Sequence, residues 1–191
     1  MTLPLATPAQ EGRTQRFDTE RYVEGYATTF DMPYLMYEFG GNKYYEVIDR
    51  SALDGADISD IIMQYNHGGK VLARQTNHTL GIEADDRGLF IFADLSKSRA
   101  AIDLYEEIRA GLITKMSWAF SVSEDAYNKD TRTRTILKIK KVYDVSAVSY
   151  PANADTDIAA RSYYDGVIEV ERREALARQR QLLLLKLNLE G

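Results

Sequence analysis

Short runs of β-branched and aromatic residues, separated by turn signals, dominate the chain from residue 22 onward. Such runs are typical of strands, because these side chains pack well on a pleated surface. Gly40-Gly41-Asn42 and Asp85-Asp86-Arg87-Gly88 lie between neighbouring runs and favour tight hairpin turns. The predicted strands are residues 22–30, 34–39, 43–48, 61–66, 79–84, 89–95, 114–122, 134–142 and 144–150. The polar stretch at residues 123–133 predicts a loop.

Two segments carry a helical pattern instead. Between Ser98 and Gly111 apolar residues recur at spacings of three and four, which predicts a helix lying on a sheet, with Ser98 as its N-cap and Gly111 as its C-cap. Residues 167–190 contain no Gly or Pro and consist of good helix formers, which predicts a second helix. The last turns of that helix are apolar nearly all round, so we expect it to dock on its own domain, on a second copy or on a partner.

The composition narrows the possible chemistry. The chain has 191 residues, of which 45% are hydrophobic and 28% charged, as in an ordinary globular domain. It has no cysteine, which excludes a disulfide scaffold, a thiol nucleophile and a cysteine-ligated zinc site. A net charge of -5 gives no support for nucleic acid or an anionic membrane as the main partner. No segment has the ~20 apolar residues of a membrane helix, and we expect an intracellular protein.

Nucleophilic catalysis without cysteine requires a serine or threonine activated by one of the two histidines, His67 and His78. His67 follows an apolar strand and precedes two glycines, a position compatible with proton exchange or with a plain loop residue. Strand alternation places Met116 and Trp118 on one face and Ser117 on the other, toward an open surface or cleft. Ser121 and Ser123 continue that face and are alternative nucleophiles.

Asp144 alternates in phase with apolar neighbours, so we expect it to share a buried face with them. A buried carboxylate needs a partner, because burying an unpaired charge is costly. A histidine N–H would be a suitable partner, as in a catalytic triad, and an ion pair with lysine or arginine is the alternative. A metal hydrolase using His67 and His78 remains a more distant possibility, since the sequence lacks HExxH spacing. Nucleotide-binding glycine motifs are also missing.

Six short blocks in order, spanning about residues 23–154, resemble the prohead protease family of tailed phages, which are capsid-maturation serine proteases related in fold to the herpesvirus assemblins. The blocks are Gly25-Tyr26-Ala27-Thr28-Thr29-Phe30; Glu46-Val47-Ile48 with a short helix at Ser51-Ala52-Leu53; Tyr65-Asn66-His67; the hairpin Thr79-Leu80, Asp85-Asp86-Arg87-Gly88-Leu89 and Ala93-Asp94-Leu95; Gly111 through Ser117-Trp118-Ala119-Phe120; and Asp144-Val145-Ser146-Ala147-Val148 with Pro151-Ala152-Asn153. The departures from the family pattern are Ala119 for a glycine, Leu53 for a phenylalanine, and Gly68 where an acid often follows the histidine.

The resemblance implies that Ser117 is the nucleophile and His67 the general base. Asp144 is then the third triad member, with His78 as the alternative because the herpesvirus proteases use a second histidine. Ser146 is expected to be a structural neighbour. The resemblance implies no cofactor and no metal. The oxyanion hole is not located by the family pattern, and residues near 123–133 and the start of the following strand are its candidates.

The fold implied by the resemblance is α+β: a β-barrel-like antiparallel sheet core, closed or nearly closed, flanked by helices, with a C-terminal helix. The implied organisation is a flexible N-terminal arm at residues 1–20, a protease domain at 21–163, and a helical segment for targeting or self-association at 164–191. The implied function is processing of the major capsid protein precursor at its scaffold region, and of the protease itself, inside the assembling prohead in the host cytoplasm. We expect a homo-oligomer formed through the C-terminal helix. An inactive relative that acts in capsid assembly by binding the scaffold is the alternative.

Overall fold

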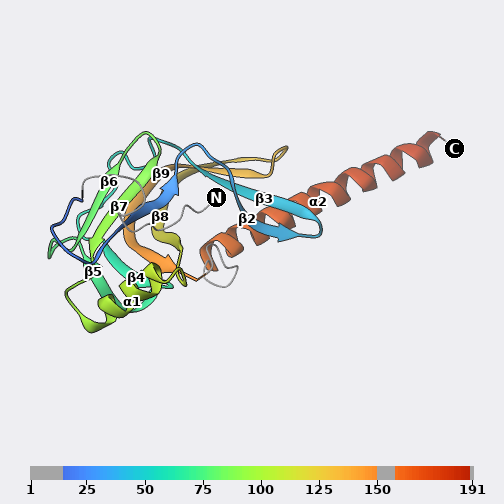
Figure 1. Cartoon of the computed structure of the whole chain (residues 1–191). Helices are drawn as coiled ribbons and strands as arrows, with labels where there is room; N and C mark the ends of the chain where they lie inside the picture. The colour runs from blue at the N-terminus through green and yellow to red at the C-terminus, as the bar shows by residue number, and fades with distance from the viewer. Residues whose placement is uncertain (1–14, 150–157, 190–191) are drawn as a thin grey trace. The chain divides into compact units, whose positions relative to one another are not determined.

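The computed structural model describes residues 15–149 and 158–189, and for side chains residues 15–149 and 166–182. The chain divides into two compact units, residues 1–153 and 154–191. The first unit holds all the strands in the described residues and one helix (Figure 1). Its strands are β1 (Tyr22–Thr29), β2 (Tyr34–Phe39), β3 (Asn42–Ile48), β4 (Ile62–Tyr65), β5 (Gly68–Arg74), β6 (Leu80–Ala84), β7 (Gly88–Asp94), β8 (Lys115–Asn128) and β9 (Thr133–Val148).

Two sheets form the first unit. β1, β7 and β6 pair in that order as an antiparallel sheet. The larger sheet has the order β2-β3-β9-β4-β5, and β8 pairs with β9 along its whole length. β3 and β4 both run parallel to β9, so this sheet is mixed. The expectation of an antiparallel sheet was therefore wrong for two of the ladders.

No closed barrel is present in the described residues. β1 lies against β8, but the two strands belong to separate sheets and are not joined by a hydrogen-bonded ladder. Register shifts interrupt β1 between Tyr26 and Thr28 and β8 at four points beyond Ala119. Bulges of this kind bend and twist a strand and end regular pairing. The described residues are thus mostly β with two helices, and they do not form the barrel-like closure predicted for the chain.

The helix predicted from residue 98 is α1 (Arg99–Arg109). The Ser98 hydroxyl accepts a hydrogen bond from the Ala101 N–H at 3.1 Å, which satisfies one of the free donors at the helix start. Gly111, with φ of +74°, takes the left-handed conformation just beyond the last turn. The predicted helix and its cap at Ser98 are confirmed, and Leu104 and Ile108 bury its apolar face.

The main hydrophobic core receives side chains from both sheets and from α1. Alternation along β4, β8 and β9 sends one set of side chains into it: Met63, Met116, Val145 and Ala147, all fully buried. Trp118 and Phe120 pack against the same core, with ring centroids 4.3 Å apart. The predicted inward face of β8 is confirmed, and the opposite face of these three strands carries Ser117, Asp144 and Ser146 among other residues.

A second, aromatic cluster lies on the other side of β1 and β7. Tyr22, Tyr26, Phe90 and Phe92 are buried there, with Phe17 packed against them. Arg16 forms an ion pair with Glu83 at 3.0 Å, and Thr19 donates a hydrogen bond to Asp94 at 2.7 Å. Residues 15–20, the described end of the predicted arm, are therefore in contact with the sheet. Residues 1–14 of that arm lie outside the described residues.

Two local predictions differ from the structure. The polar stretch at 123–133 is a β-hairpin, because β8 continues to Asn128 and β9 begins at Thr133. Ion pairs across this hairpin join Glu124 to Lys138 at 2.6 Å and Asp125 to Arg134 at 2.8 Å, and such pairs stabilise a ladder that has little apolar content. The short helix expected at residues 51–53 is a turn.

The predicted turn between β2 and β3 is confirmed, and Gly40 and Gly41, both with positive φ, form it.

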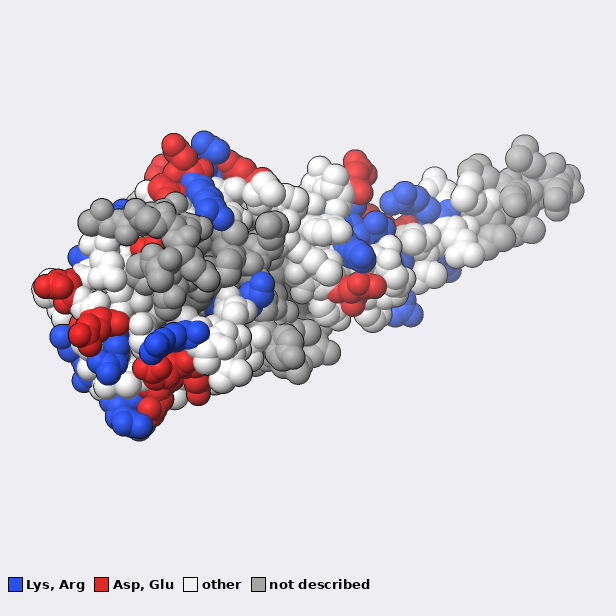
Figure 2. All heavy atoms as spheres, in the orientation of Figure 1, with Lys and Arg blue, Asp and Glu red and all other residues white. Residues whose placement is uncertain are grey.

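The second unit consists of α2 (Ile158–Leu189), which begins before the predicted segment. Val170, Leu176 and Leu182 are exposed on it, and Glu169 pairs with Arg173 one turn on at 2.8 Å. The Pro151-Ala152-Asn153 block lies outside the described residues. No helix in the described part of the chain is both long enough and apolar enough to cross a membrane. Acidic and basic side chains are intermixed on the face of the molecule drawn in Figure 2.

Candidate active site

The turn between β4 and β5 carries His67. Tyr65 pairs with Gly68, so Asn66 and His67 are the two central residues of a tight hairpin. Both have positive φ, +50° for Asn66 and +54° for His67, as the two-residue turns of hairpins require. This region is unfavourable for residues other than glycine, although asparagine and histidine enter it more readily than most. The histidine is thus held in a costly backbone conformation at the end of a core strand.

Asn66 connects this turn to the end of β9. Its N–H donates to the Ala147 carbonyl at 3.0 Å, and its Oδ1 accepts from the Ser149 N–H at 3.1 Å. Its Nδ2 donates more weakly to Ser149 Oγ at 3.4 Å, and the Tyr65 hydroxyl lies 2.5 Å from that oxygen. The turn is therefore fixed against β9 by main-chain and side-chain hydrogen bonds.

The His67 ring contacts the carboxylate of Asp144. Nδ1 lies 2.7 Å from Asp144 Oδ1, the length of a charge-assisted hydrogen bond. Asp144 is buried, and the His67 side chain is 21% exposed. An ionised carboxylate only accepts hydrogen bonds, so Nδ1–H is the donor of this contact when Asp144 is ionised. Of the two partners left open for Asp144, the structure contains the histidine.

Strand register brings Ser117 to the same face. β8 pairs with β9 so that Ser117 is opposite Ser146 and Ala119 is opposite Asp144. On the other side of β9, Gln64 of β4 is opposite Ser146. Directly paired residues and residues two apart share a sheet face, so Ser117, Ser146 and Asp144 all lie on one face. Ser117 is partly exposed, and its side chain makes no hydrogen bond within the described residues.

The alternative serines on β8 have other surroundings. Ser121 is opposite Lys141, and its Oγ accepts from the Tyr143 hydroxyl at 3.4 Å. Ser123 is exposed and donates to the Lys138 carbonyl at 3.1 Å. Both lie beyond Asp144 in the ladder, whereas Ser117 is opposite Ser146, on the side of Asp144 where the Asn66–His67 turn meets Ala147. Among the serines of this strand, Ser117 is therefore the one nearest in register to the His67–Asp144 pair.

His78 lies apart from this pair. It occupies the turn between β5 and β6, is exposed, and has φ of +60°. Its N–H donates to the Gln75 carbonyl at 3.0 Å. The structure does not bring it together with His67 and Asp144. Across the side chains that the structure describes, no three histidine or acidic groups converge in an arrangement suited to a metal ion.

The residues considered for the oxyanion hole are remote from Ser117. Asn128 and Thr133 pair at the far end of the β8–β9 hairpin, eleven positions from Ser117. At about 3.3 Å per residue this separation is roughly 36 Å. That expectation was wrong, because residues 123–133 form the far end of a long ladder and not a loop beside Ser117.

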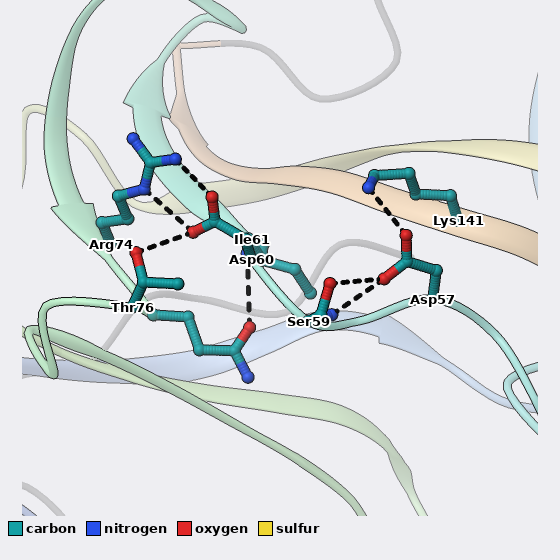
Figure 3. Close-up of polar contacts among 8 residues, drawn as sticks. Asp57, Ser59, Asp60, Ile61, Arg74, Thr76 and Lys141 are labelled. Carbon is teal, nitrogen blue, oxygen red and sulfur yellow. Dashed lines mark hydrogen bonds and ion pairs between the residues drawn. The ribbon is translucent and has the colours of Figure 1, made fainter.

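The start of β4 is held by two ion-pair clusters (Figure 3). Lys141 donates to Asp57 at 2.7 Å, and the Ser59 hydroxyl donates to the same aspartate at 2.7 Å. These two hydrogen bonds hold the pKa of Asp57 well below its usual range. Asp60 binds the guanidinium of Arg74, which lowers the pKa of Asp60 and raises that of Arg74. These contacts are on the surface and lie at the opposite end of β4 from His67.

Sequence reasoning missed two features of the site. Ser146 was expected only to be a structural neighbour, and the contact in which its hydroxyl donates to Asp144 Oδ1 at 2.7 Å was not foreseen. Asn66 was noted only as part of a motif. An asparagine before His-Gly-Gly at the end of a strand is a turn signal that could have predicted the left-handed hairpin. No local signal could have found the Ser146 contact, because it depends on the rotamers of two residues on one strand.

Comparison with known proteins places this chain in a family. Residues 7–167 match the model of the Caudovirus prohead serine protease family, and the chain belongs to that family. It is also 31% identical over 84 residues to the "Prohead protease" of Enterobacteria phage HK97. That similarity covers 44% of this chain and 37% of the relative, so the chain matches well under half of the relative's length. No solved structure matches the chain.

Proposed function

We propose that this chain is a serine endopeptidase in which Ser117 is the nucleophile, His67 the general base and Asp144 the residue that orients the imidazole. The observation that carries the proposal is the 2.7 Å contact between His67 Nδ1 and Asp144 Oδ1, on the sheet face that also holds Ser117. Membership of a serine protease family supports it independently.

The proposed reaction follows from these positions. Ser117 Oγ attacks the carbonyl carbon of a peptide bond while His67 Nε2 accepts the hydroxyl proton. The protonated ring is stabilised by Asp144 and gives its proton to the leaving amine as the C–N bond breaks. Water then hydrolyses the Ser117 ester with His67 again acting as base. Catalytic hydrogen bonds to a nucleophile often shorten only when substrate binds, so a Ser117 hydroxyl that has no hydrogen bond among the described residues is compatible with this role.

The proposed substrates are the capsid precursor, cut in the scaffold region of the major capsid protein, and the protease itself. The proposed location is the interior of the assembling prohead. Family membership supports this assignment, because the family is named for prohead proteases. The exposed apolar side chains of α2, Val170, Leu176 and Leu182, support a further proposal that this helix mediates self-association or targeting.

The test is co-expression of the chain with the capsid precursor from its own phage, followed by intact-mass spectrometry. We expect truncated products with the wild type and with Ser121→Ala, a matched control on the same strand. We expect only full-length chains with Ser117→Ala. Identical cutting in all three samples would assign the cleavage to a host protease and contradict the proposal. Full-length products in every sample would favour the inactive, scaffold-binding relative.

A further inference from the structure

Ser146 is a fully buried hydroxyl group at the centre of the site, and the reaction proposed above does not use it. It donates to Asp144 Oδ1 at 2.7 Å. The same carboxylate oxygen lies 2.7 Å from His67 Nδ1. One oxygen atom is thus held between a serine donor on its own strand and the imidazole of the β4–β5 turn.

We propose that Ser146 is a positioning residue that holds the Asp144 carboxylate in the orientation that binds His67. This inference rests on the proposed function of Ser117, His67 and Asp144. In this role the Ser146 hydroxyl does not contact substrate and takes no part in forming or breaking bonds. It also explains why a polar group occupies a position with no solvent exposure, where an unpaired hydroxyl would be costly.

The sheet makes Ser146 a rigid support. Its backbone lies between β4 and β8, opposite Gln64 on one side and Ser117 on the other. An aspartate side chain rotates about its last bond within a broad energy well, so its carboxylate direction is set by its partners. A donor fixed by two neighbouring ladders restricts that rotation, and the oxygen presented to His67 Nδ1 is then always the same one. Hydrogen bonds to an ionised acceptor are about twice as strong as neutral ones, which suits them to this task.

Ser146 is unsuited to the role of nucleophile. Its hydroxyl proton is engaged with Asp144, and the side chain is fully buried. Ser117, opposite it in the ladder, is partly exposed. The two serines therefore divide between them the tasks of supporting the acid and attacking the substrate.

The chain supplies a matched control at the other end of β4. Ser59 Oγ donates to Asp57 Oδ1 at 2.7 Å, which is the same contact between the same residue types two positions apart (Figure 3). Ser59→Ala removes an equivalent hydrogen bond away from the site. A general effect of losing a serine–aspartate hydrogen bond would appear in both variants, whereas a positioning effect would appear only in Ser146→Ala.

The experiment measures two properties of the purified full-length chain. The first is the rate of covalent labelling by a fluorophosphonate, in which Ser117 Oγ bonds to phosphorus, fluoride leaves and His67 accepts the hydroxyl proton. The second is the downfield proton NMR resonance of the His67 Nδ1–H, which reports the hydrogen bond to Asp144 whether or not the chain is active. Circular dichroism of each variant checks that it folds. The variants are Ser146→Ala, Ser146→Thr, which keeps the hydroxyl on a residue suited to a strand, and Ser59→Ala.

We expect Ser146→Ala to lower the labelling rate about 10- to 100-fold, the effect of losing one hydrogen bond to a charged group, and to shift or broaden the His67 resonance. Ser146→Thr should restore most of the rate, and Ser59→Ala should leave both readouts unchanged. In an Asp144→Asn background, Ser146→Ala should have no further effect on the rate, because the hydroxyl acts only through that carboxylate.

A labelling rate and a His67 resonance that are both unchanged in Ser146→Ala would overturn the proposal. An equal loss in Ser59→Ala, or a further loss in the Asp144→Asn background, would also overturn it. A wild-type chain that is not labelled at all would instead count against the proposed protease function. The NMR comparison would still decide the role of Ser146 in that case, so the two failures are distinguishable.

Discussion

The two ends of β4 are held in different ways. At its start, surface ion pairs join Asp57 to Lys141 and Asp60 to Arg74. At its end, Asn66 and His67 adopt left-handed backbone conformations held by hydrogen bonds to β9. Unfavourable backbone geometry is retained in proteins where the surroundings impose it, and it concentrates at functional sites. The comparison indicates that ion pairs fix the start of β4 to neighbouring strands, whereas the turn at its end holds the His67 side chain in one place.

The largest expected effect comes from removing that imidazole. His67→Ala should lower the cleavage rate by a factor on the order of 10⁴, because the proposed general base is lost while substrate binding remains. His78→Ala is the matched control, since His78 also has a positive φ and lies in an exposed turn. Kinetics on a peptide that spans an identified cleavage site provide the measurement. Equal losses in the two variants would contradict the distinction drawn between the histidines.

Asp144→Asn tests the partner of the imidazole and should have the next largest effect. The asparagine amide is nearly the same size but can present N–H groups to Nδ1, which favours the wrong tautomer of His67. We expect kcat to fall by a factor of about 10³ to 10⁴ while KM changes little. Nitrogen-15 NMR of the histidine ring would report the tautomer directly. An Asp144→Asn chain with normal kcat would remove Asp144 from the mechanism.

Substitution of Asn66 separates backbone strain from side-chain contacts. Asn66→Gly keeps easy access to positive φ but loses the hydrogen bonds to Ser149, whereas Asn66→Ala loses both advantages. We expect Asn66→Ala to be less stable than Asn66→Gly by about 1 kcal/mol in urea denaturation. Both variants should react with the fluorophosphonate more slowly than wild type, because the His67 side chain is less firmly held. Equal stability of the two variants would show that the turn does not need a left-handed residue at this position.

Removing the ion pairs at the start of β4 should have the smallest effect, and it should change only the stability of the fold. The pKa of Asp57 and of Asp60 is lower in the fold than the ordinary value of 3.8, chiefly because of Lys141 and Arg74 respectively. Their contribution to stability is therefore complete above that value and is lost as the pH falls below it. A double Asp57→Asn, Asp60→Asn variant should have a slightly lower Tm at neutral pH and a shallower fall in Tm on acidification. Its catalytic rate at neutral pH should equal that of wild type.

The sequence predicted the parts of the fold that depend on local pattern. Alternation around Ser117 identified the core face of β8, and Ser98 correctly marked the start of α1. β5 was missed because Gly68, Gly69 and Lys70 interrupt its apolar pattern. The parallel pairing of β3 and β4 with β9 was also missed, since pairing between distant segments leaves no local signal.

The sequence indicated candidate residues for the site but not their geometry. Resemblance to the family indicated Ser117, His67 and Asp144. Alternation indicated a buried Asp144, which is observed, although the core residues Val145 and Ala147 lie on the other face of β9. The contact between His67 and Asp144 joins residues 77 positions apart, and the Ser146 contact depends on side-chain rotamers within β9, so neither leaves a local signal in the sequence. The hairpin at 123–133 looked like a loop because it is polar, and its extension is supported by cross-strand ion pairs and by the pairing of β3 with the start of β9.

The most direct test of the account is to locate the serine that reacts with a fluorophosphonate, by tandem mass spectrometry of the labelled wild-type chain. The account predicts one modified peptide, with the phosphonyl group on Ser117, and no modification at that residue in the His67→Ala variant. A label on Ser121, Ser123 or Ser146, or a label on Ser117 that does not depend on His67, would contradict it.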